Sequence, residues 1–138
     1  TVTDPVALDR LLAVPHAHLI VDGYNVTKTG YGSLPLADQR SRLVGSLAAL
    51  AGRVAVEVTV AFDDAQRPPA QPQAPRGVRV LFSAAGEIAD DLIRRLVSAE
   101  PPGRPVIVVT TDQEVVADVL RAGGWTVPAS VFLERVGS

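Results

Sequence analysis

The sequence predicts an α/β fold, a three-layer α/β/α sandwich whose central sheet is mainly parallel. Two observations lead to this prediction. Short runs of apolar and β-branched residues alternate along the chain with longer segments in which apolar residues recur at helical spacing. Strands that alternate with helices are joined by right-handed crossovers, which place helices on both faces of a parallel sheet. In addition, the apolar runs are followed by acidic residues, which this fold would bring together at one edge of the sheet.

Five strands are predicted from the apolar runs. They lie at residues 19–21, 54–62, 77–83 and 105–111, with a last short strand at 125–127 or 130–133. The first run, Leu-Ile-Val, is bounded by Asp22 and Gly23 and shows no polar alternation, which indicates a strand buried on both faces. The second run is rich in valine, as is typical of strands, and ends at Asp63.

Helices are predicted between the strands. They lie at residues 5–13, within an N-terminal helical segment 1–17, at 35–51, at 86–97 and after residue 111. Ser33 before the second helix suits a cap, and Gly52 after it suits a stop. The last helix starts with Thr111-Asp112-Gln113-Glu114, which has the Thr-x-x-Glu form of a capping box. Residues 65–76 contain four prolines, which favours a loop.

Composition narrows the class of protein. Of the 138 residues, 47% are hydrophobic and 20% are charged, which fits one compact domain over residues 1–138. Because the chain starts at Thr1, we expect it to be a piece cut from a longer protein. The lack of cysteine excludes disulfides and zinc–thiolate clusters. No apolar stretch reaches the roughly 18 to 20 residues of a membrane span and no signal peptide is recognised, so a soluble, cytoplasmic protein is expected.

Acidic residues follow the carboxyl end of each of the first four predicted strands. They are Asp22, Asp63, Asp64, Glu87, Asp90, Asp91 and Asp112. Carboxylates gathered at one edge repel one another, and a divalent cation relieves that repulsion. An all-oxygen site suits Mg²⁺ or Mn²⁺. Such an ion can activate water and stabilise a leaving oxygen, so the pattern favours hydrolysis of phosphodiesters.

Each acid also has a purely structural explanation. Asp22 before Gly23 suits a turn, and Asp112 suits the start of a helix, where an acid faces the macrodipole. Glu87 fits a first helical turn, and one of Asp90 and Asp91 is expected to form only a surface ion pair with Arg94 or Arg95. These explanations do not account for an acid at every strand end. His16, His18 and Trp125 are expected to pack or to face solvent.

Four motifs occur in a fixed order along the chain: VDGYNV at 21–26, VAFDDA at 60–65, FSAAGEIADDLI at 82–93 and VVTTDQEV at 108–115. In this order and spacing they resemble the YacP-like branch of the NYN domain family, relatives of the PIN-domain nucleases. The resemblance implies a PIN-like parallel sheet with strand order 3-2-1-4-5. It also implies metal-dependent cleavage of RNA, with ribosome-associated messenger RNA as a substrate of some bacterial relatives.

The resemblance assigns roles to individual residues. It implies metal binding by Asp22, by Asp91 with Asp90 as its pair, and by Asp112, and it makes Asn25 the polar residue of the Asp-Gly-x-Asn motif. Supporting positions would be Asp63, Glu87 and Thr111, the last in a Thr-Thr-Asp sequence where relatives often carry Thr-Ser-Asp. A further acid often follows the last motif in PIN-like nucleases, and the candidates here are Glu114 and Asp118. The expected RNA contacts are Lys28, Arg67, Arg76 and the ring of Tyr24.

The leading hypothesis is therefore a Mg²⁺- or Mn²⁺-dependent endoribonuclease, in which Asp22, Asp91 and Asp112 hold the metal and Asn25 orients water or a phosphate oxygen. The alternative is an RNA- or ribosome-binding module of the same fold with weak or no nuclease activity, favoured by the formal net charge of −2 and the unassigned fourth acid. A phosphohydrolase with an aspartyl nucleophile would need a second acid two residues after Asp22, and that position is Tyr24. No phosphate-binding glycine loop and no Gly-x-Ser-x-Gly sequence is present, which argues against nucleoside triphosphate binding and acyl transfer.

Overall fold

The computed structural model describes residues 1–66, 68 and 73–136. The strands are β1 (His18–Asp22), β2 (Glu57–Phe62), β3 (Val78–Phe82), β4 (Val106–Val109) and β5 (Trp125–Val127). The helices are α1 (Pro5–Leu12), α2 (Gly23–Tyr31), α3 (Leu36–Ala51), α4 (Ala89–Ser98), α5 (Gln113–Arg121) and α6 (Ala129–Val136), and a short 3₁₀ helix, η1 (Asp64–Gln66), follows β2. None of the helices in these ranges is both long and apolar enough to span a bilayer.

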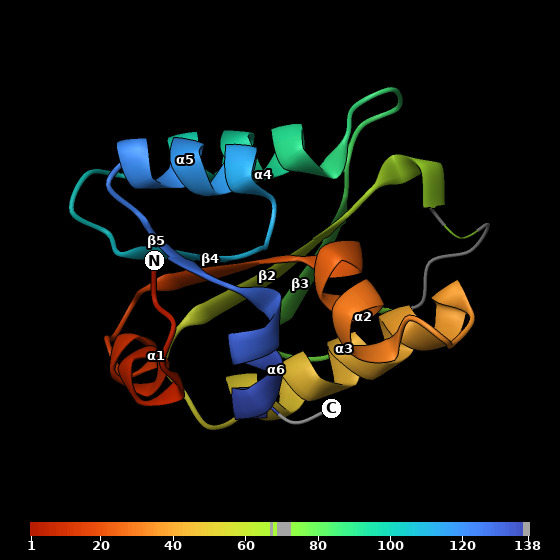
Figure 1. Cartoon of the computed structure of the whole chain (residues 1–138), viewed down its shortest axis with the longest axis horizontal. Helices are drawn as coiled ribbons and strands as arrows, with labels where there is room; N and C mark the ends of the chain where they lie inside the picture. The colour runs from red at the N-terminus through yellow and green to blue at the C-terminus, as the bar shows by residue number, and fades with distance from the viewer. Residues whose placement is uncertain (67, 69–72, 137–138) are drawn as a thin grey trace.

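The five strands form one parallel sheet in the order β3-β2-β1-β4-β5. Helices α1, α2, α3 and α6 lie on one face of the sheet, and α4 and α5 lie on the other (Figure 1). The predicted three-layer sandwich with strand order 3-2-1-4-5 is therefore confirmed. Because β1 is the central strand, the residue at its carboxyl end lies in the middle of the edge that the carboxyl ends of the strands form.

The central strand is buried on both faces, as its apolar run predicted. All five residues of β1 are buried. Leu19 and Val21 join the larger core, which faces α1, α2, α3 and α6, whereas Ile20 joins the smaller core beneath α4 and α5. A strand between two helical layers has no solvent-facing side, which is why its sequence shows no polar alternation.

Two helices were not predicted from the sequence. Helix α2 begins directly after β1, although its glycines and threonines have low helix propensity, and it extends to Tyr31. It is stabilised by burial of Tyr24, Val26 and Tyr31. Helix α6 covers residues 130–133, so the alternative position of the last strand is wrong and the strand lies at Trp125–Val127. Periodicity cannot tell a short apolar run in a helix from one in a strand.

The carboxyl ends of all strands meet at one edge because the sheet is parallel. There β1 ends in Asp22, and Gly23 immediately begins α2. A Cβ at Gly23 would lie 2.4 Å from two ring carbons of Phe62 at the end of β2. Space therefore requires the glycine, and the close packing holds Asp22 against the end of the neighbouring strand.

Candidate metal centre

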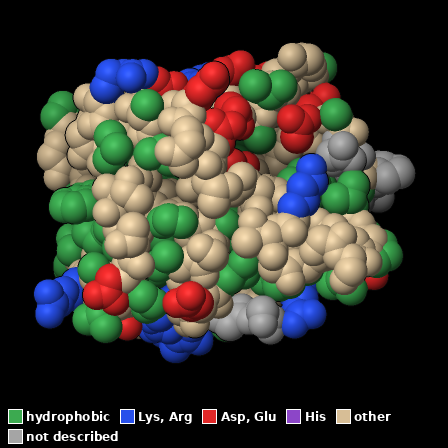
Figure 2. Space-filling view, in the orientation of Figure 1, with side chains coloured by type: hydrophobic (Ala, Val, Ile, Leu, Met, Phe, Trp, Pro, Cys, Tyr) green, Lys and Arg blue, Asp and Glu red, His purple; other side chains and the backbone are tan. Residues whose placement is uncertain are grey.

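Four aspartates from distant parts of the chain lie together at this edge: Asp22, Asp63, Asp90 and Asp112, hereafter the acidic edge. Burial raises the pKa of Asp22 from 3.8 to about 6; a hydrogen bond from Thr110 opposes the rise, and the charges of Asp90, Asp112 and Asp63 add to it. Figure 2 shows acidic side chains gathered around the beginning of α4, beside the carboxyl edge of the sheet. Of the seven acids expected at this edge, these four therefore lie near one another, and Asp22 is the most buried of them.

Thr110 orients the central carboxylate. Its hydroxyl donates to Oδ2 of Asp22 at 2.8 Å and accepts from the backbone N–H of Asp112 at 3.1 Å. Thr110 is 1% exposed and Asp22 is 6% exposed, so the link between them is shielded from solvent. The sequence reasoning named Thr111 and missed Thr110, although the doubled threonine directly after β4 was the available signal.

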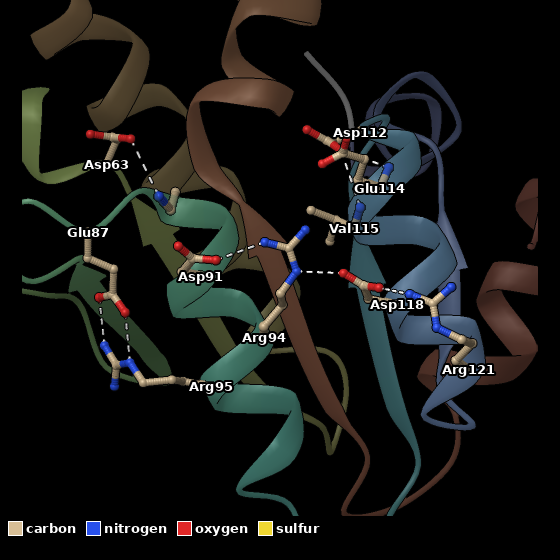
Figure 3. A network of polar contacts seen from close by, with 11 residues as sticks. Asp63, Glu87, Asp91, Arg94, Arg95, Asp112, Glu114, Val115, Asp118 and Arg121 are labelled. Atoms are coloured by element: carbon tan, nitrogen blue, oxygen red, sulfur yellow. Dashed lines mark hydrogen bonds and ion pairs between the residues drawn. The ribbon is translucent and has the colours of Figure 1, made fainter.

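Asp90, and not Asp91, belongs to the acidic edge. Burial raises the pKa of Asp90, and the charge of Asp112 and a hydrogen bond with it raise that pKa further. Asp91 points to the solvent side of α4, where its Oδ1 accepts from Arg94 at 2.9 Å (Figure 3). The structure thus places Asp91 away from the predicted metal position, because adjacent residues of a helix point about 100° apart.

Asp112 has two roles. Its Oδ1 accepts from the backbone N–H groups of Glu114 and Val115, at 2.9 and 3.2 Å, and so caps the start of α5 (Figure 3). The predicted capping box is therefore wrong, since Asp112 takes the place of Thr111 as the cap. The charge of Asp112 also raises the pKa of Asp90, which places the two carboxyl groups near each other. A cation bound between them would relieve the repulsion of their negative charges.

Asn25 joins two motifs. Its Nδ2 donates to Oγ1 of Thr111 at 2.8 Å, and its Oδ1 accepts from the backbone N–H of Thr111 at 3.0 Å. Both ends of the amide are therefore bound to the turn between β4 and α5. This arrangement makes Asn25 and Thr111 a connection between the start of α2 and that turn, rather than groups directed at a water molecule.

The predicted supporting residues hold the loops around the site. Asp63 accepts from the backbone N–H of Ala65 at 2.9 Å and of Ala89 at 3.4 Å, which ties the end of β2 to the start of α4. Glu87 forms two hydrogen bonds with Arg95, at 2.8 and 2.9 Å, and these bonds hold the pKa of Glu87 at about 2 (Figure 3). Glu87 therefore stabilises the loop before α4, and its carboxylate does not face the acidic edge.

The residues predicted to contact RNA differ in their exposure to solvent. The ring of Tyr24 is 7% exposed and packs on Phe62 with centroids 4.8 Å apart, and its hydroxyl accepts from Arg40 at 2.9 Å. It offers no face for a base, so the stacking prediction is wrong and Tyr24 is a packing residue. Lys28 is exposed on α2, which begins directly after Asp22. Arg76 is also exposed, but it precedes β3 and therefore lies at the amino ends of the strands, away from the acidic edge. Arg67 lies outside the described residues.

A second cluster lies at the opposite edge of the sheet. Ligand atoms of His18, Glu57 and Glu100 lie within 4.8 Å of one another. Both ring nitrogens of buried His18 are engaged, Nδ1 with Glu100 and Nε2 with Thr59 at 2.7 Å. Arg104 donates to Glu100 at 2.8 Å and to Glu57 at 3.3 Å, so the cluster already contains its own cation. We therefore assign it a structural role, which the sequence did not reveal because its members are far apart in the chain.

The raised pKa of Asp22 predicts how stability depends on pH. Burial favours the protonated form of Asp22 in the folded state. Its contribution to the free energy of unfolding is therefore fully present below pH 3.8 and is lost as pH rises through about 6. The pKa shift of Asp22 corresponds to about 3 kcal/mol of this free energy. Chelator-treated protein should therefore unfold at a higher temperature at pH 5.0 than at pH 7.5, measured by circular dichroism. The Asp22→Asn variant should lose most of this difference; an equal pH dependence in both proteins would contradict the prediction.

A family model described as the YacP-like NYN domain matches residues 19–138. The crystal structure of Rae1 (YacP) from Bacillus subtilis superposes with a TM-score of 0.76 at 25% sequence identity, covering 86% of this chain and 72% of that chain. The structure of its W164L mutant gives a TM-score of 0.72 at 22% identity with the same coverage. No curated protein matches the chain in sequence.

Proposed function

The chain belongs to the family of YacP-like NYN domains, and we propose that it is a Mg²⁺- or Mn²⁺-dependent endoribonuclease that acts at the acidic edge. The observation that carries this proposal is the convergence of Asp22, Asp90 and Asp112 from three separate motifs. Membership of the NYN family supports a nuclease. Action on ribosome-associated messenger RNA remains a prediction from the family resemblance.

The donor set of the acidic edge fits a hard divalent cation. All the side-chain groups there are carboxylate oxygens, and Mg²⁺ is usually held by one or two carboxylates together with water and phosphate oxygens. Among the described residues, no three of these carboxylates have oxygens within 4.8 Å of one another. Asp22, Asp90 and Asp112 would therefore hold an ion partly through water. When bound, the ion would lower the pKa of a water molecule and stabilise the leaving oxygen.

The surrounding residues would keep the carboxylates in place. Thr110 fixes the orientation of Asp22, and Asn25 fixes the turn that carries Asp112. Asp63 holds the start of α4, from which Asp90 projects. Exposed Lys28, on the helix that begins directly after Asp22, would contact an RNA phosphate near the acidic edge.

Incubation with RNA tests the proposal. We expect the protein to cut circular single-stranded RNA in Mn²⁺ or Mg²⁺ and to lose this activity in excess chelator. A circular substrate has no ends, so its cleavage reports endonuclease action. Intact RNA in both conditions would contradict the proposal.

The alternative is an RNA-binding module with little nuclease activity. It is favoured by the position of Asp118, the candidate for a further metal-binding acid, which instead forms ion pairs with Arg94 and Arg121. RNA binding with no cleavage in the same assay would support this alternative, whereas absence of both would argue against either function.

A further inference from the structure

A network of charged residues crosses from α4 to α5 just behind the acidic edge. Arg94 lies at its centre, with Nη1 donating to Asp91 at 2.9 Å and Nε donating to Asp118 at 2.6 Å. Asp118 also pairs with Arg121. Figure 3 shows the two aspartates on opposite sides of the Arg94 guanidinium, one on each helix. The guanidinium is therefore held in one orientation by two anchors.

The remaining nitrogen of Arg94 points toward the acidic edge. Within the described ranges, Nη2 makes no hydrogen bond, and Figure 3 shows it on the side of the network where Asp63 and Asp112 lie. Arg94 stands one helical turn after Asp90.

We infer that Arg94 binds a non-bridging oxygen of the phosphodiester at the acidic edge through Nη2, an inference that rests on the proposed function. A guanidinium is a planar donor that suits phosphate oxygens. Asp91 and Asp118 occupy Nη1 and Nε, which keeps the guanidinium from turning onto Asp90. Arg94 therefore offers a fixed positive charge to a phosphate, beside carboxylates that would otherwise repel it.

A purely structural role for Arg94 makes a different prediction. Ion pairs of partly exposed side chains contribute only about 0 to 1 kcal/mol to stability. If Arg94 merely joined α4 to α5, removal of Asp118 would have the same effect as removal of Arg94, because each change breaks the link between the helices. If Arg94 binds phosphate, loss of the guanidinium is far more costly than loss of one anchor.

The test compares Arg94→Lys, Arg94→Gln and Asp118→Asn, with Arg121→Gln as the matched control, because Arg121 is 72% exposed and pairs with the same aspartate. Single-turnover cleavage of RNA is measured at saturating Mn²⁺, and affinity for Mn²⁺ is measured without RNA. Affinity for single-stranded RNA is measured in Ca²⁺ over a range of salt concentrations. Thermal unfolding of each variant shows whether it is folded.

We expect Arg94→Lys to lower the cleavage rate constant about 100-fold, the loss typical of one preorganised donor, with Mn²⁺ affinity nearly unchanged. Asp118→Asn should lower it only a few-fold, and Arg121→Gln should cleave as the wild type does. Arg94→Gln should reduce the slope of log affinity against log salt by about 0.7, the value for one lost phosphate contact on a single strand.

Two results would overturn the inference. One is equal loss of cleavage in Arg94→Lys and Asp118→Asn, accompanied by an equal fall in melting temperature. The other is an unchanged salt slope in Arg94→Gln. If the wild type binds RNA without cutting it, the proposed nuclease function fails, and the salt slope alone then decides whether Arg94 contacts phosphate.

Discussion

Replacement of Asp22 by asparagine should abolish metal-dependent RNA cleavage. Asparagine has nearly the same shape, and its side-chain oxygen can still accept from Thr110, so the fold should be retained. It cannot supply a negative charge to a cation. Loss of a residue that merely orients a metal ligand costs about 10- to 100-fold in metal affinity or activity, so loss of the central ligand should lower the cleavage rate by more than about 100-fold.

The same variant should be more stable than the wild type in the absence of metal. At pH 7.5 the wild type must keep a buried carboxylate charged against its raised pKa of about 6, and asparagine removes that cost. A higher melting temperature in chelator, together with lost cleavage in Mn²⁺, would identify Asp22 as a residue retained for function at the expense of stability. Cleavage at the wild-type rate by a folded Asp22→Asn protein would contradict its assignment as a metal ligand.

Asp90 and Asp91 should behave differently although they are adjacent. Asp90→Asn removes a carboxylate from the acidic edge and should lower the rate of cleavage by more than about tenfold and weaken Mn²⁺ binding. Asp91→Asn removes only a surface contact with Arg94, worth about 0 to 1 kcal/mol, and should lower the rate no more than a few-fold.

The two variants serve as controls for each other, because they make the same chemical change on the same turn of α4. Single-turnover cleavage at several Mn²⁺ concentrations separates a loss of metal affinity from a loss of rate. A larger loss in Asp91→Asn than in Asp90→Asn would restore the assignment made from the sequence and contradict the one made from the structure.

Much of the fold could be predicted from local patterns. Three patterns each indicate one element: the apolar run before Asp22, the valine-rich run before Asp63 and the leucine spacing of α3. A strand buried on both faces is continuously apolar, whereas a helix buried on one face has apolar residues at helical spacing. Helices α2 and α6 could not be predicted in this way. The first has low propensity and is stabilised by tertiary packing. In the second, the consecutive apolar residues Val131, Phe132 and Leu133 equally suit a strand.

The site was predictable at the level of strand ends but not of side-chain direction. An acid after a strand was enough to expect Asp22 and Asp112 at one edge. Which of Asp90 and Asp91 faces that edge depends on the rotation of α4 about its axis, and that rotation is set by the packing of Leu92 and Ile93 against the sheet. The burial of Tyr24 likewise depends on Phe62, which is 38 residues later in the chain.

By itself, the sequence determined the order of the strands and of helices α1, α3, α4 and α5, the acids that follow the strands, and the family resemblance. These features depend on residue type and on spacing within short segments, and the repeat of a strand or a helix can be read from such a segment alone. Only the tertiary structure decided that Asp91 pairs with Arg94, that Thr110 holds Asp22, and that Nη2 of Arg94 is directed at the acidic edge. Each of these depends on contacts between elements, and their geometry arises only when the helices pack on the sheet.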